Sequence, residues 1–306
     1  MKSQKWQKLG QIFSPSNLGS HFASHASLPM AVRLQGNQYE VYFSSRDLNN
    51  VSYTTSIRMD MTMPVNTKGL PTQVILGPGD LGTFDDSGAM ATWFTSYKQK
   101  NYLYYIGWNL GKTVPFRNAI GLAVSDNRTD FERIAAGPIL DRSLYEPHFC
   151  ASCCVIPGDD KWRMWYLSCT EWRMNNGYPE HRYHIKYAES QDGIHWVRNG
   201  IIAIDFADNN EIAISRPSVL FYQGLWRMWF SFRRSGNSYR IGYAESADGI
   251  TWKRSPDPVL DVSKHGWDSQ MVEYPYVFSH SGKLYMLYNG NDYGKTGFGI
   301  AALEKL

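Results

Sequence analysis

The segment Tyr187-Ala-Glu-Ser-Gln-Asp-Gly-Ile-His-Trp196 returns 56 residues later as Tyr243-Ala-Glu-Ser-Ala-Asp-Gly-Ile-Thr-Trp252. In both copies an arginine follows the tryptophan at the same spacing. A Trp-Arg-Met-Trp motif precedes both, at 162–165 and at 226–229. A chain that repeats a strand pair together with its turn contains several copies of one β-unit. The repeat therefore predicts the fold more firmly than it predicts a reaction.

Strand patterns extend this unit over the whole chain. Each copy has an apolar first strand, an aromatic second strand, a third strand that ends near a turn, and a short fourth strand. Alternating, β-branched and aromatic residues favour strands throughout, and no long stretch has the 3.6-residue period of a helix. We predict an all-β protein, a single five-bladed β-propeller domain over 1–306, with blades at 14–65, 66–140, 141–205, 206–262 and 263–306.

The last copy ends before its fourth strand, and the missing piece lies at the other end of the chain. The stretch Lys5-Trp-Gln-Lys-Leu-Gly-Gln-Ile-Phe13 resembles the fourth strand that begins at Thr251. We infer that residues 5–9 supply the outer strand of the last blade and close the ring. Closure leaves only short, protected strand edges, which limits edge-to-edge aggregation.

Composition limits the class of protein. Aromatic residues make up 15% of the chain and charged residues 19%, which indicates a globular protein. The net charge of +3 comes from 31 basic and 28 acidic residues without a basic run, so we expect no nucleic-acid partner. The N-terminus lacks the apolar stretch of a signal peptide, and no 18-residue apolar span follows. We therefore expect a cytoplasmic protein without a membrane span.

All four cysteines fall within 20 residues, at Cys150, Cys153, Cys154 and Cys169. Their spacing, with His148 nearby, suggests a metal, but a second closely spaced ligand pair is missing. We interpret them as buried small hydrophobic residues with reduced thiols, and we expect no metal and no cofactor. The alternative is a cation in the channel, although Ca²⁺ would need about six to eight oxygen ligands.

Polar residues gather where each first strand begins. The innermost strands of a propeller surround a central funnel, so these side chains should converge on one point. Gathering several acids is costly without a ligand, because like charges raise one another's pKa. The candidates are His25, Asp85 or Asp86, Glu146 with His148, Glu211 with Arg216, and Asp268 with Glu273.

The ends of the second strands supply a second ring of candidates. Aromatic faces and planar hydrogen-bonding groups suit sugar recognition. Arg117 lies in a long insertion between strands of the second blade, from which it can reach over the pocket. For each member, loop capping or a surface ion pair is the alternative role. These candidates are Arg46, Asp47, Trp108, Asn109, Glu171, Trp172, Arg233, Arg234, Asn289 and Asn291.

With the blades aligned, the Ser-x-Asp-Gly-x-x-Trp turns and the aromatic second strands carry a family resemblance. The chain resembles the five-bladed propeller superfamily of arabinanases, levansucrases and invertases, and the glycoside hydrolase families 32, 43 and 130. It is more specifically similar to uncharacterised propeller proteins found with bacterial surface-polysaccharide genes. The stretches that carry this similarity are 84–88, 105–109, 266–269, 273–275 and 288–291.

The resemblance implies a carboxylate base or nucleophile from the first blade, a second carboxylate and a glutamic acid. The chain departs from this pattern. Residues 27–29 read Ser-Leu-Pro where Asp-Pro is expected, and Arg216-Pro217 has no aspartate between them. The usual triad therefore does not transfer. We predict a different set of catalytic acids, namely Asp86, Glu146, Glu211 and Glu273.

Together with these acids, the resemblance implies a carbohydrate-active enzyme of glycoside hydrolase type that cleaves or transfers a glycosyl unit in the funnel. Cleavage needs one protonated carboxyl and one ionised partner, and the sequence leaves the pair open. The guanidinium groups of Arg46, Arg216 and Arg233 could bind phosphate oxygens through paired hydrogen bonds. Such binding suits a phosphorylase or a transferase in polysaccharide synthesis. The expected partner is a sugar, an oligosaccharide or an activated sugar. The alternatives are a catalytically silent glycan- or nucleotide-sugar-binding propeller and a protein-interaction scaffold.

Overall fold

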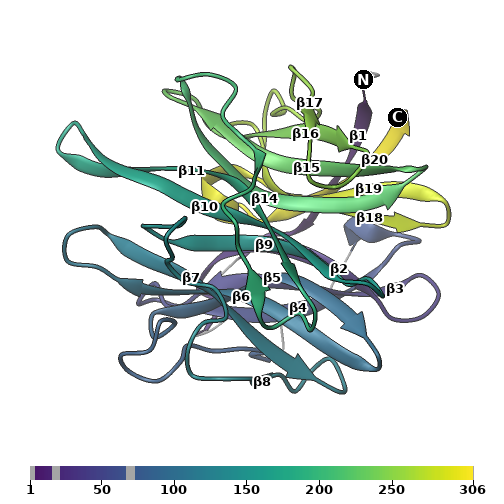
Figure 1. Cartoon of the computed structure of the whole chain (residues 1–306). Helices are drawn as coiled ribbons and strands as arrows, with labels where there is room; N and C mark the ends of the chain where they lie inside the picture. The colour runs from purple at the N-terminus through teal and green to yellow at the C-terminus, as the bar shows by residue number, and fades with distance from the viewer. Residues whose placement is uncertain (1–3, 16–20, 67–72, 306) are drawn as a thin grey trace.

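The computed structural model describes residues 4–15, 21–66 and 73–305. Over these ranges almost every regular element is a β-strand (Figure 1). The exceptions are a 3₁₀ turn at Pro64–Asn66 and the four-residue helix α1 (Asn291–Gly294). The chain is therefore nearly all-β, as its alternating and aromatic patterns predict.

Consecutive strands pair antiparallel into units. The first unit contains β2 (Ser24–Arg33), β3 (Gln38–Arg46) and β4 (Ser52–Asp60). The second contains β5 (Gly88–Tyr97), β6 (Lys100–Leu110), β7 (Phe116–Ser125) and β8 (Glu132–Arg133). The third contains β9 (Cys150–Ile156), β10 (Trp162–Asn175) and β11 (Tyr178–Ser190), with β12 (Trp196–Val197) and β13 (Ile202–Ile204) both on β11.

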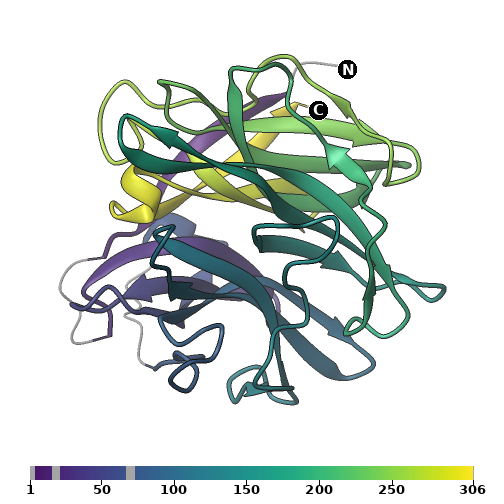
Figure 2. The same cartoon turned by 60° about the vertical axis from the view of Figure 1, so that its left-hand side comes forward.

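The chain then builds two more units of the same kind. The fourth unit contains β14 (Glu211–Tyr222), β15 (Leu225–Arg234), β16 (Arg240–Ser246) and β17 (Lys253–Arg254). The last contains β18 (Glu273–His280), β19 (Lys283–Asn289), β20 (Phe298–Lys305) and the N-terminal strand β1 (Lys5–Phe13). Its order is β1-β20-β19-β18, so β1 lies at the outer edge where residues 5–9 are expected. The first and last strands of the chain consequently lie side by side (Figure 2).

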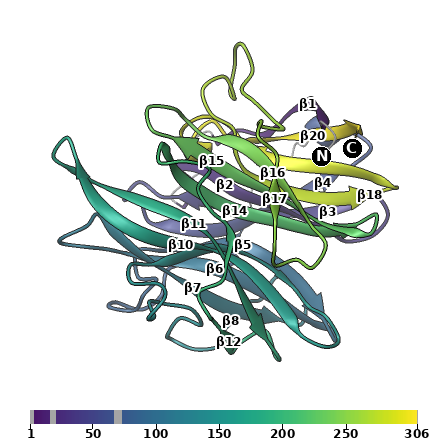
Figure 3. The same cartoon turned by 45° about the horizontal axis from the view of Figure 1, so that its top comes forward.

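The first strand of each unit is almost entirely buried, whereas the later strands reach the surface. These inner strands touch in chain order, β2 with β5, β5 with β9, β9 with β14 and β14 with β18, and β18 also contacts β2. Backbone pairing between units is sparse, for example a single parallel pair between Tyr183 and Ala213. Side-chain packing therefore holds the units together, because one cluster of buried hydrophobic residues includes members of every unit. Figure 3 shows the units obliquely from above.

The repeated turns supply one such contact. Asp192 Oδ1 accepts the backbone N–H groups of Ile194 and His195 at 2.8 Å each, which is the capping role expected of Asp in a tight turn. The carbonyl of the next residue, Gly193, accepts the hydroxyl of Tyr104 from the preceding unit at 2.8 Å. The second copy repeats the contact, because Trp165 donates its indole N–H to Gly249 at 2.8 Å. The repeat thus encodes both a turn and its anchor on the neighbouring unit.

The cysteines fit the prediction of buried, reduced side chains. Cys150, Cys153, Cys154 and Cys169 are all buried and all free thiols. Within the described ranges, no group of three or more His, Cys, Asp or Glu side chains is arranged to hold a metal ion. No helix in the same ranges is long and apolar enough to cross a membrane.

Candidate functional site

Several predicted acids lie in a repeated buried ion pair. The acid stands just before or at the start of a first strand, and the base comes from the end of the same unit, at or next to its outer strand. The acids are at most 4% exposed. The pairs are Asp85–Arg133 at 2.8 Å, Glu146–Arg198 at 3.1 Å, Glu211–Arg254 at 2.7 Å and Asp268–Lys8 at 2.6 Å.

Second-strand tyrosines complete three of these pairs. The hydroxyl of Tyr166 donates to Glu146 at 3.0 Å, and Tyr105 and Tyr288 donate in the same way to the acids of their own units at 3.1 Å. Each of these three acids therefore links the entrance of a unit to its second and outermost strands. This arrangement places Glu146, Glu211 and Asp268 away from the central cavity, contrary to the expectation that they converge there.

Glu146 has the most partners of these acids. Its carboxylate accepts the hydroxyl of Ser143, the ammonium of Lys186 at 3.2 Å and the guanidinium of Arg198. Burial by itself would raise the pKa of Glu146. The hydrogen bond from Ser143 and the charge of Lys186 outweigh burial and lower the pKa below its ordinary value. Glu146 is accordingly an ionised, fully satisfied group.

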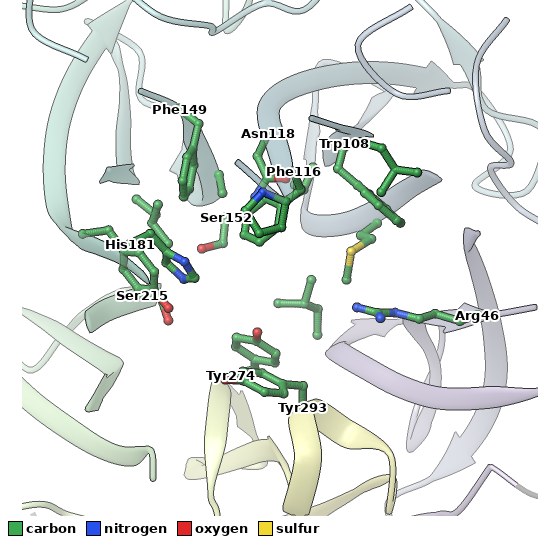
Figure 4. A pocket seen from close by; sticks show the side chains of 18 of the residues that line it. Arg46, Trp108, Phe116, Asn118, Phe149, Ser152, His181, Ser215, Tyr274 and Tyr293 are labelled. Atoms are coloured by element: carbon green, nitrogen blue, oxygen red, sulfur yellow. The ribbon is translucent and has the colours of Figure 1, made fainter. Parts of the chain in front are cut away.

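A central cavity of about 490 Å³ lies where the units meet (Figure 4). Figure 4 shows side chains from different units that point into one shared space. Of the predicted residues, Arg46 and Trp108 line it. The other lining residues are Leu28, Asn50, Met90, Ile106, Leu110, Pro115, Phe116, Asn118, Phe149, Ala151, Ser152, Leu167, His181, Tyr183, Ser215, Tyr274 and Tyr293.

One wall of the cavity is aromatic. Phe116 lies 5.8 Å from Phe149, and His181 stacks on Tyr183 at 5.0 Å with 16° between the ring planes. Burial, helped by the charge of Arg233, lowers the pKa of His181 to about 4. His181 therefore presents a neutral imidazole at neutral pH. Sequence reasoning missed these rings, because they meet only when the long β10–β11 hairpin packs beside the second unit.

The opposite wall is polar and basic. Trp108 donates its indole N–H to Ser52 at 3.1 Å, which fixes the ring that faces the cavity. The Arg46 guanidinium donates to Asn50 at 2.8 Å, and it has no carboxylate partner among the described residues. No aspartate or glutamate of the described ranges lines this cavity. The lining is therefore positively charged.

The first strands carry register shifts close to the cavity. Leu28, Arg216 and Tyr274 occupy such shifts, each has a positive φ (57°, 51° and 53°) and each precedes a proline. In the other two units the shift falls at Thr92 and Ser152. Leu28 is the position at which the family resemblance leads one to expect an aspartate. The structure therefore has a leucine side chain on the cavity wall at this point.

Arg216 extends from the fourth unit to the first two and is fully buried. Its guanidinium donates to the carbonyl and, at 2.8 Å, to the hydroxyl of Thr92, and to the carbonyl of Pro29 at 3.4 Å. Burial lowers its pKa to about 10, so it remains a cation. Arg216 thus cross-links first strands and does not line the cavity, which differs from its predicted role in substrate binding.

Glu273 is a buried carboxyl group beside the cavity-lining Tyr274. It has no exposed surface, and neither carboxyl oxygen has a hydrogen-bond partner in the described structure. Burial raises the pKa of Glu273 well above its usual range, although the charge of Arg233 opposes this shift. Arg233 itself lies over the ring of Tyr239 at 5.4 Å, and its Nε also lacks a partner. Burial and the missing hydrogen-bond partners therefore both favour the protonated, neutral form of Glu273.

Other predicted residues hold loops or make local contacts. Asp47 Oδ1 accepts two backbone N–H groups of its own turn at 2.8 Å, and Asn291 Oδ1 accepts those of Gln270 and Met271. Glu171 lies 3.7 Å from Arg182 in a partly exposed ion pair. These three residues lie outside the central cavity.

His25 and Asp86 also lie outside the central cavity. His25 Nδ1 is 2.9 Å from the hydroxyl of Ser24, and burial, together with the charge of Arg46, lowers its pKa to about 4. Asp86 accepts the backbone N–H of Gly82 and the hydroxyl of Ser87 at 3.1 Å each, in a separate surface hollow.

A second cavity of about 110 Å³ brings together three predicted residues, Asn109 and Arg117 of one hairpin and the more distant His148. Arg142, which sequence reasoning did not single out, joins them. Asn118 lines both cavities, so the two spaces are adjacent.

Comparison with solved structures shows a shared fold. An RGII complex of BT0996 superimposes with a TM-score of 0.74 at 17% identity, over 99% of this chain and 93% of the compared one. A thermostable family-43 glycoside hydrolase gives 0.65 at 17% identity, over 93% and 89% of the two chains. The GH32 beta-fructofuranosidase BmSUC1 of Bombyx mori gives 0.63 at 12% identity, over 98% and 61%. The resemblance to the propeller glycosidase superfamily is thus confirmed at the level of the fold.

Among family models, none matches the chain. Curated proteins do match: uncharacterized protein MT1551 and uncharacterized protein Rv1502, from two strains of Mycobacterium tuberculosis. Both are 40% identical over 300 residues, which cover 98% of this chain and 99% of each relative. The chain therefore belongs to the family of these uncharacterized mycobacterial proteins.

Proposed function

We propose that this protein is a carbohydrate-active enzyme of glycosidase type, which binds a glycosyl unit in the central cavity and uses Glu273 as its acid. The observation that carries this proposal is a fully buried, unpartnered carboxyl group with a raised pKa, next to a cavity lined by aromatic faces and hydrogen-bonding groups. The solved structures that share the fold support the glycosidase class.

The cavity has the features of a sugar site. Its volume of about 490 Å³ lies within the usual range for small-molecule pockets. The ring of Trp108 and the aromatic wall of Phe116 and Phe149 offer faces for the C–H groups of a sugar. Ser152 and Ser215 supply hydroxyl partners for its polar edge.

Glu273 suits the role of a general acid. Its pKa is raised by burial, so at neutral pH it holds a proton that it can give to a glycosidic oxygen. The bond from that oxygen to the anomeric carbon breaks while an acceptor oxygen bonds to the same carbon. The glutamate left behind is an anion near the Arg233 guanidinium, and it recovers its proton from solvent. The unpartnered Nε of Arg233 is available to this anion.

Access to Glu273 requires a change in the wall of the cavity. We assign this change to Tyr293, a cavity-lining residue that is 43% exposed. Burial, and after it the nearby Glu273, raise the pKa of Tyr293. Tyr293 and its neighbour Asp292 have φ of 59° and 54°, a left-handed conformation that is strained for such residues. A sugar in the cavity can displace the Tyr293 ring, and a shift of this strained segment would open the wall further.

A single acid favours an acceptor that needs no protein base. An anionic acceptor such as phosphate fits this requirement, so we favour phosphorolysis, or transfer from an activated sugar, over hydrolysis. Because phosphate and activated sugars are abundant in the cytoplasm, we also propose a cytoplasmic role in polysaccharide synthesis.

The decisive experiment compares the wild type with Glu273→Gln. Both are incubated with a panel of oligosaccharides with and without inorganic phosphate, and products are separated by chromatography. The proposal expects Glu273→Gln to reduce turnover by about 10²–10⁴-fold. It also expects sugar affinity, measured by calorimetry, to stay nearly unchanged. Turnover by Glu273→Gln at the wild-type rate would exclude Glu273 as the acid.

A catalytically silent glycan- or nucleotide-sugar-binding protein is the second candidate. It is favoured by the lack of any carboxylate on the described cavity lining, and by Leu28 where the related hydrolases are expected to have an acid. In this case the panel sugars bind to the wild type but are never converted.

We also propose that the antiparallel units are the five blades of one propeller domain, closed by β1. The ordered contacts of the inner strands and the pairing of Trp6 with Leu303 in β20 support this arrangement. Removal of residues 1–13 should then lower the melting temperature sharply and leave a protein that self-associates through the exposed edge of β20.

A further inference from the structure

The second cavity is rich in positive charge. It lies between the second and third units, because Asn109, Arg117 and Asn118 belong to β6 and β7, whereas Arg142 and His148 precede β9. Its remaining lining residues are Phe84, Ala119 and Asp141. Two arginines and a histidine thus face one carboxylate.

These basic groups are free to bind a ligand. Within the described structure, the side chains of Arg117 and His148 have no hydrogen-bond or ion-pair partner. Arg142 lies 3.7 Å from Asp141, a weak ion pair between half-exposed groups. The Asp141 carboxylate already accepts a backbone N–H at 2.7 Å. An anion in this cavity would therefore meet two available guanidinium groups.

The β6–β7 hairpin connects this cavity to the central one. In its ladder Trp108 pairs with Asn118, and Asn109 pairs with Arg117. Successive side chains of a strand point to opposite faces. Accordingly Trp108 lines the central cavity, Asn109 and Arg117 line the second, and Asn118 contributes to both. A ligand that lies beside Asn118 can therefore occupy both spaces.

We propose that the second cavity is a subsite for the phosphoryl group of a phosphorylated sugar whose ring lies in the central cavity. A guanidinium fork matches phosphate oxygens with paired, charge-assisted hydrogen bonds, and Arg117 and Arg142 can supply two such forks. The cavity of about 110 Å³ suits a compact anion better than a second sugar ring. This subsite rests on the proposed sugar site and identifies the class of its substrate.

In the test, calorimetry measures the binding of inorganic phosphate, glucose 1-phosphate and uridine diphosphate glucose to the protein. Glucuronate is titrated in the same way, to test whether the cavity prefers a carboxylate to a phosphoryl group. The test variant is R117A/R142A, and the matched control is Lys112→Ala, a basic side chain in the same hairpin that lines neither cavity. Both arginines are exposed and without strong partners, so the variant should keep the wild-type melting temperature, which is measured in parallel.

We expect R117A/R142A to weaken the binding of phosphate by about tenfold or more, since a hydrogen bond to a charged group contributes on the order of 1.5–3 kcal/mol. Lys112→Ala should bind as the wild type does. Tighter binding of glucose 1-phosphate or of the nucleotide sugar shows which source of the phosphoryl group the site prefers, and either result supports the subsite. Two results would overturn the subsite. One is equal phosphate affinity in wild type and R117A/R142A, and the other is binding of glucuronate without any binding of phosphate.

The phosphate titration is independent of the sugar site, because inorganic phosphate needs only the second cavity. If phosphate binds as expected but no sugar binds and no glycosyl unit is transferred, the subsite stands and the proposed function fails. If neutral oligosaccharides bind and phosphate does not, the reverse holds.

Discussion

Arg254 holds the carboxylate of Glu211 with both terminal nitrogens, at 2.7 and 2.8 Å. The two residues lie 43 positions apart, one at the entrance of the fourth unit and one in its outermost strand. Such a paired geometry is the strongest form of the arginine–carboxylate contact. An acid–base pair at the matching place recurs in the second, third and last units, so it acts as a clamp on four of the β-units.

Loss of this clamp should destabilise the protein. Arg254→Ala leaves the Glu211 carboxylate buried without its partner, which should lower the free energy of unfolding by about 3 kcal/mol. Urea denaturation at neutral pH measures the change. The matched control is Arg234→Ala, whose ion pair with Asp208 is exposed and should contribute less than about 1 kcal/mol. Equal stability of the two variants would show that the clamp is not structural.

Glu146 should give the protein stability that is lost in acid. Its pKa is below the ordinary value of 4.5 in the folded state, despite the opposing effect of burial. In the pH range between the folded pKa and 4.5 the unfolded chain binds more protons, so the free energy of unfolding falls as the pH falls. Glu146→Gln lacks this contribution.

The difference in stability between wild type and Glu146→Gln should therefore be largest at neutral pH and shrink below pH 4.5. Denaturation at several pH values from neutral to strongly acidic measures it. A difference that stays constant over this range would mean that folding does not lower the pKa of Glu146.

The sequence was a good guide to the β-units and a poor guide to the direction of their acids. The repeat predicted the strand order, the turns at Asp192 and Asp248, and the place of β1, because these depend on local pattern. The acids at the strand entrances could face either the axis or the outermost strand. Arg198 and Arg254 stand at matching positions in the repeat, and that match was the signal for the ion pairs.

The cavity itself could be predicted only in part. Arg46, Trp108 and Arg117 follow from the ends of second strands and from the insertion in the second unit. His181 and Tyr183 could not, because the β10–β11 hairpin carries them to the cavity only through contacts with another unit. Long-range packing of this kind leaves no periodic signal in the sequence.

Glu273 should have the opposite pH effect to Glu146. Burial raises its folded pKa above the ordinary value of 4.5, so above pH 4.5 the unfolded chain releases a proton that the folded chain keeps. The free energy of unfolding therefore falls as the pH rises from 4.5 toward the folded pKa. Glu273→Gln cannot ionise and should lack this loss.

Glu273→Gln should consequently gain stability relative to the wild type as the pH rises above 4.5, which thermal unfolding across neutral and alkaline pH measures. Glu273→Asp serves as the control, because it keeps the titrating group. Parallel stability profiles for wild type and Glu273→Gln would contradict a neutral Glu273 and remove the basis for its role as an acid.

The residue that precedes the N-terminal strand should contribute to stability through its side chain. Gln4 Oε1 accepts the indole N–H groups of Trp6 at 3.0 Å and of Trp229, in the fourth unit, at 2.9 Å. Both rings are buried, so Gln4→Ala leaves two indole donors without partners. Each such donor costs about 1–3 kcal/mol, and the melting temperature should fall accordingly. Lys5→Ala removes only an exposed ion pair with Glu304 and should change stability little. If both variants have the same melting temperature, the hydrogen bonds of Gln4 contribute nothing to the stability of the protein.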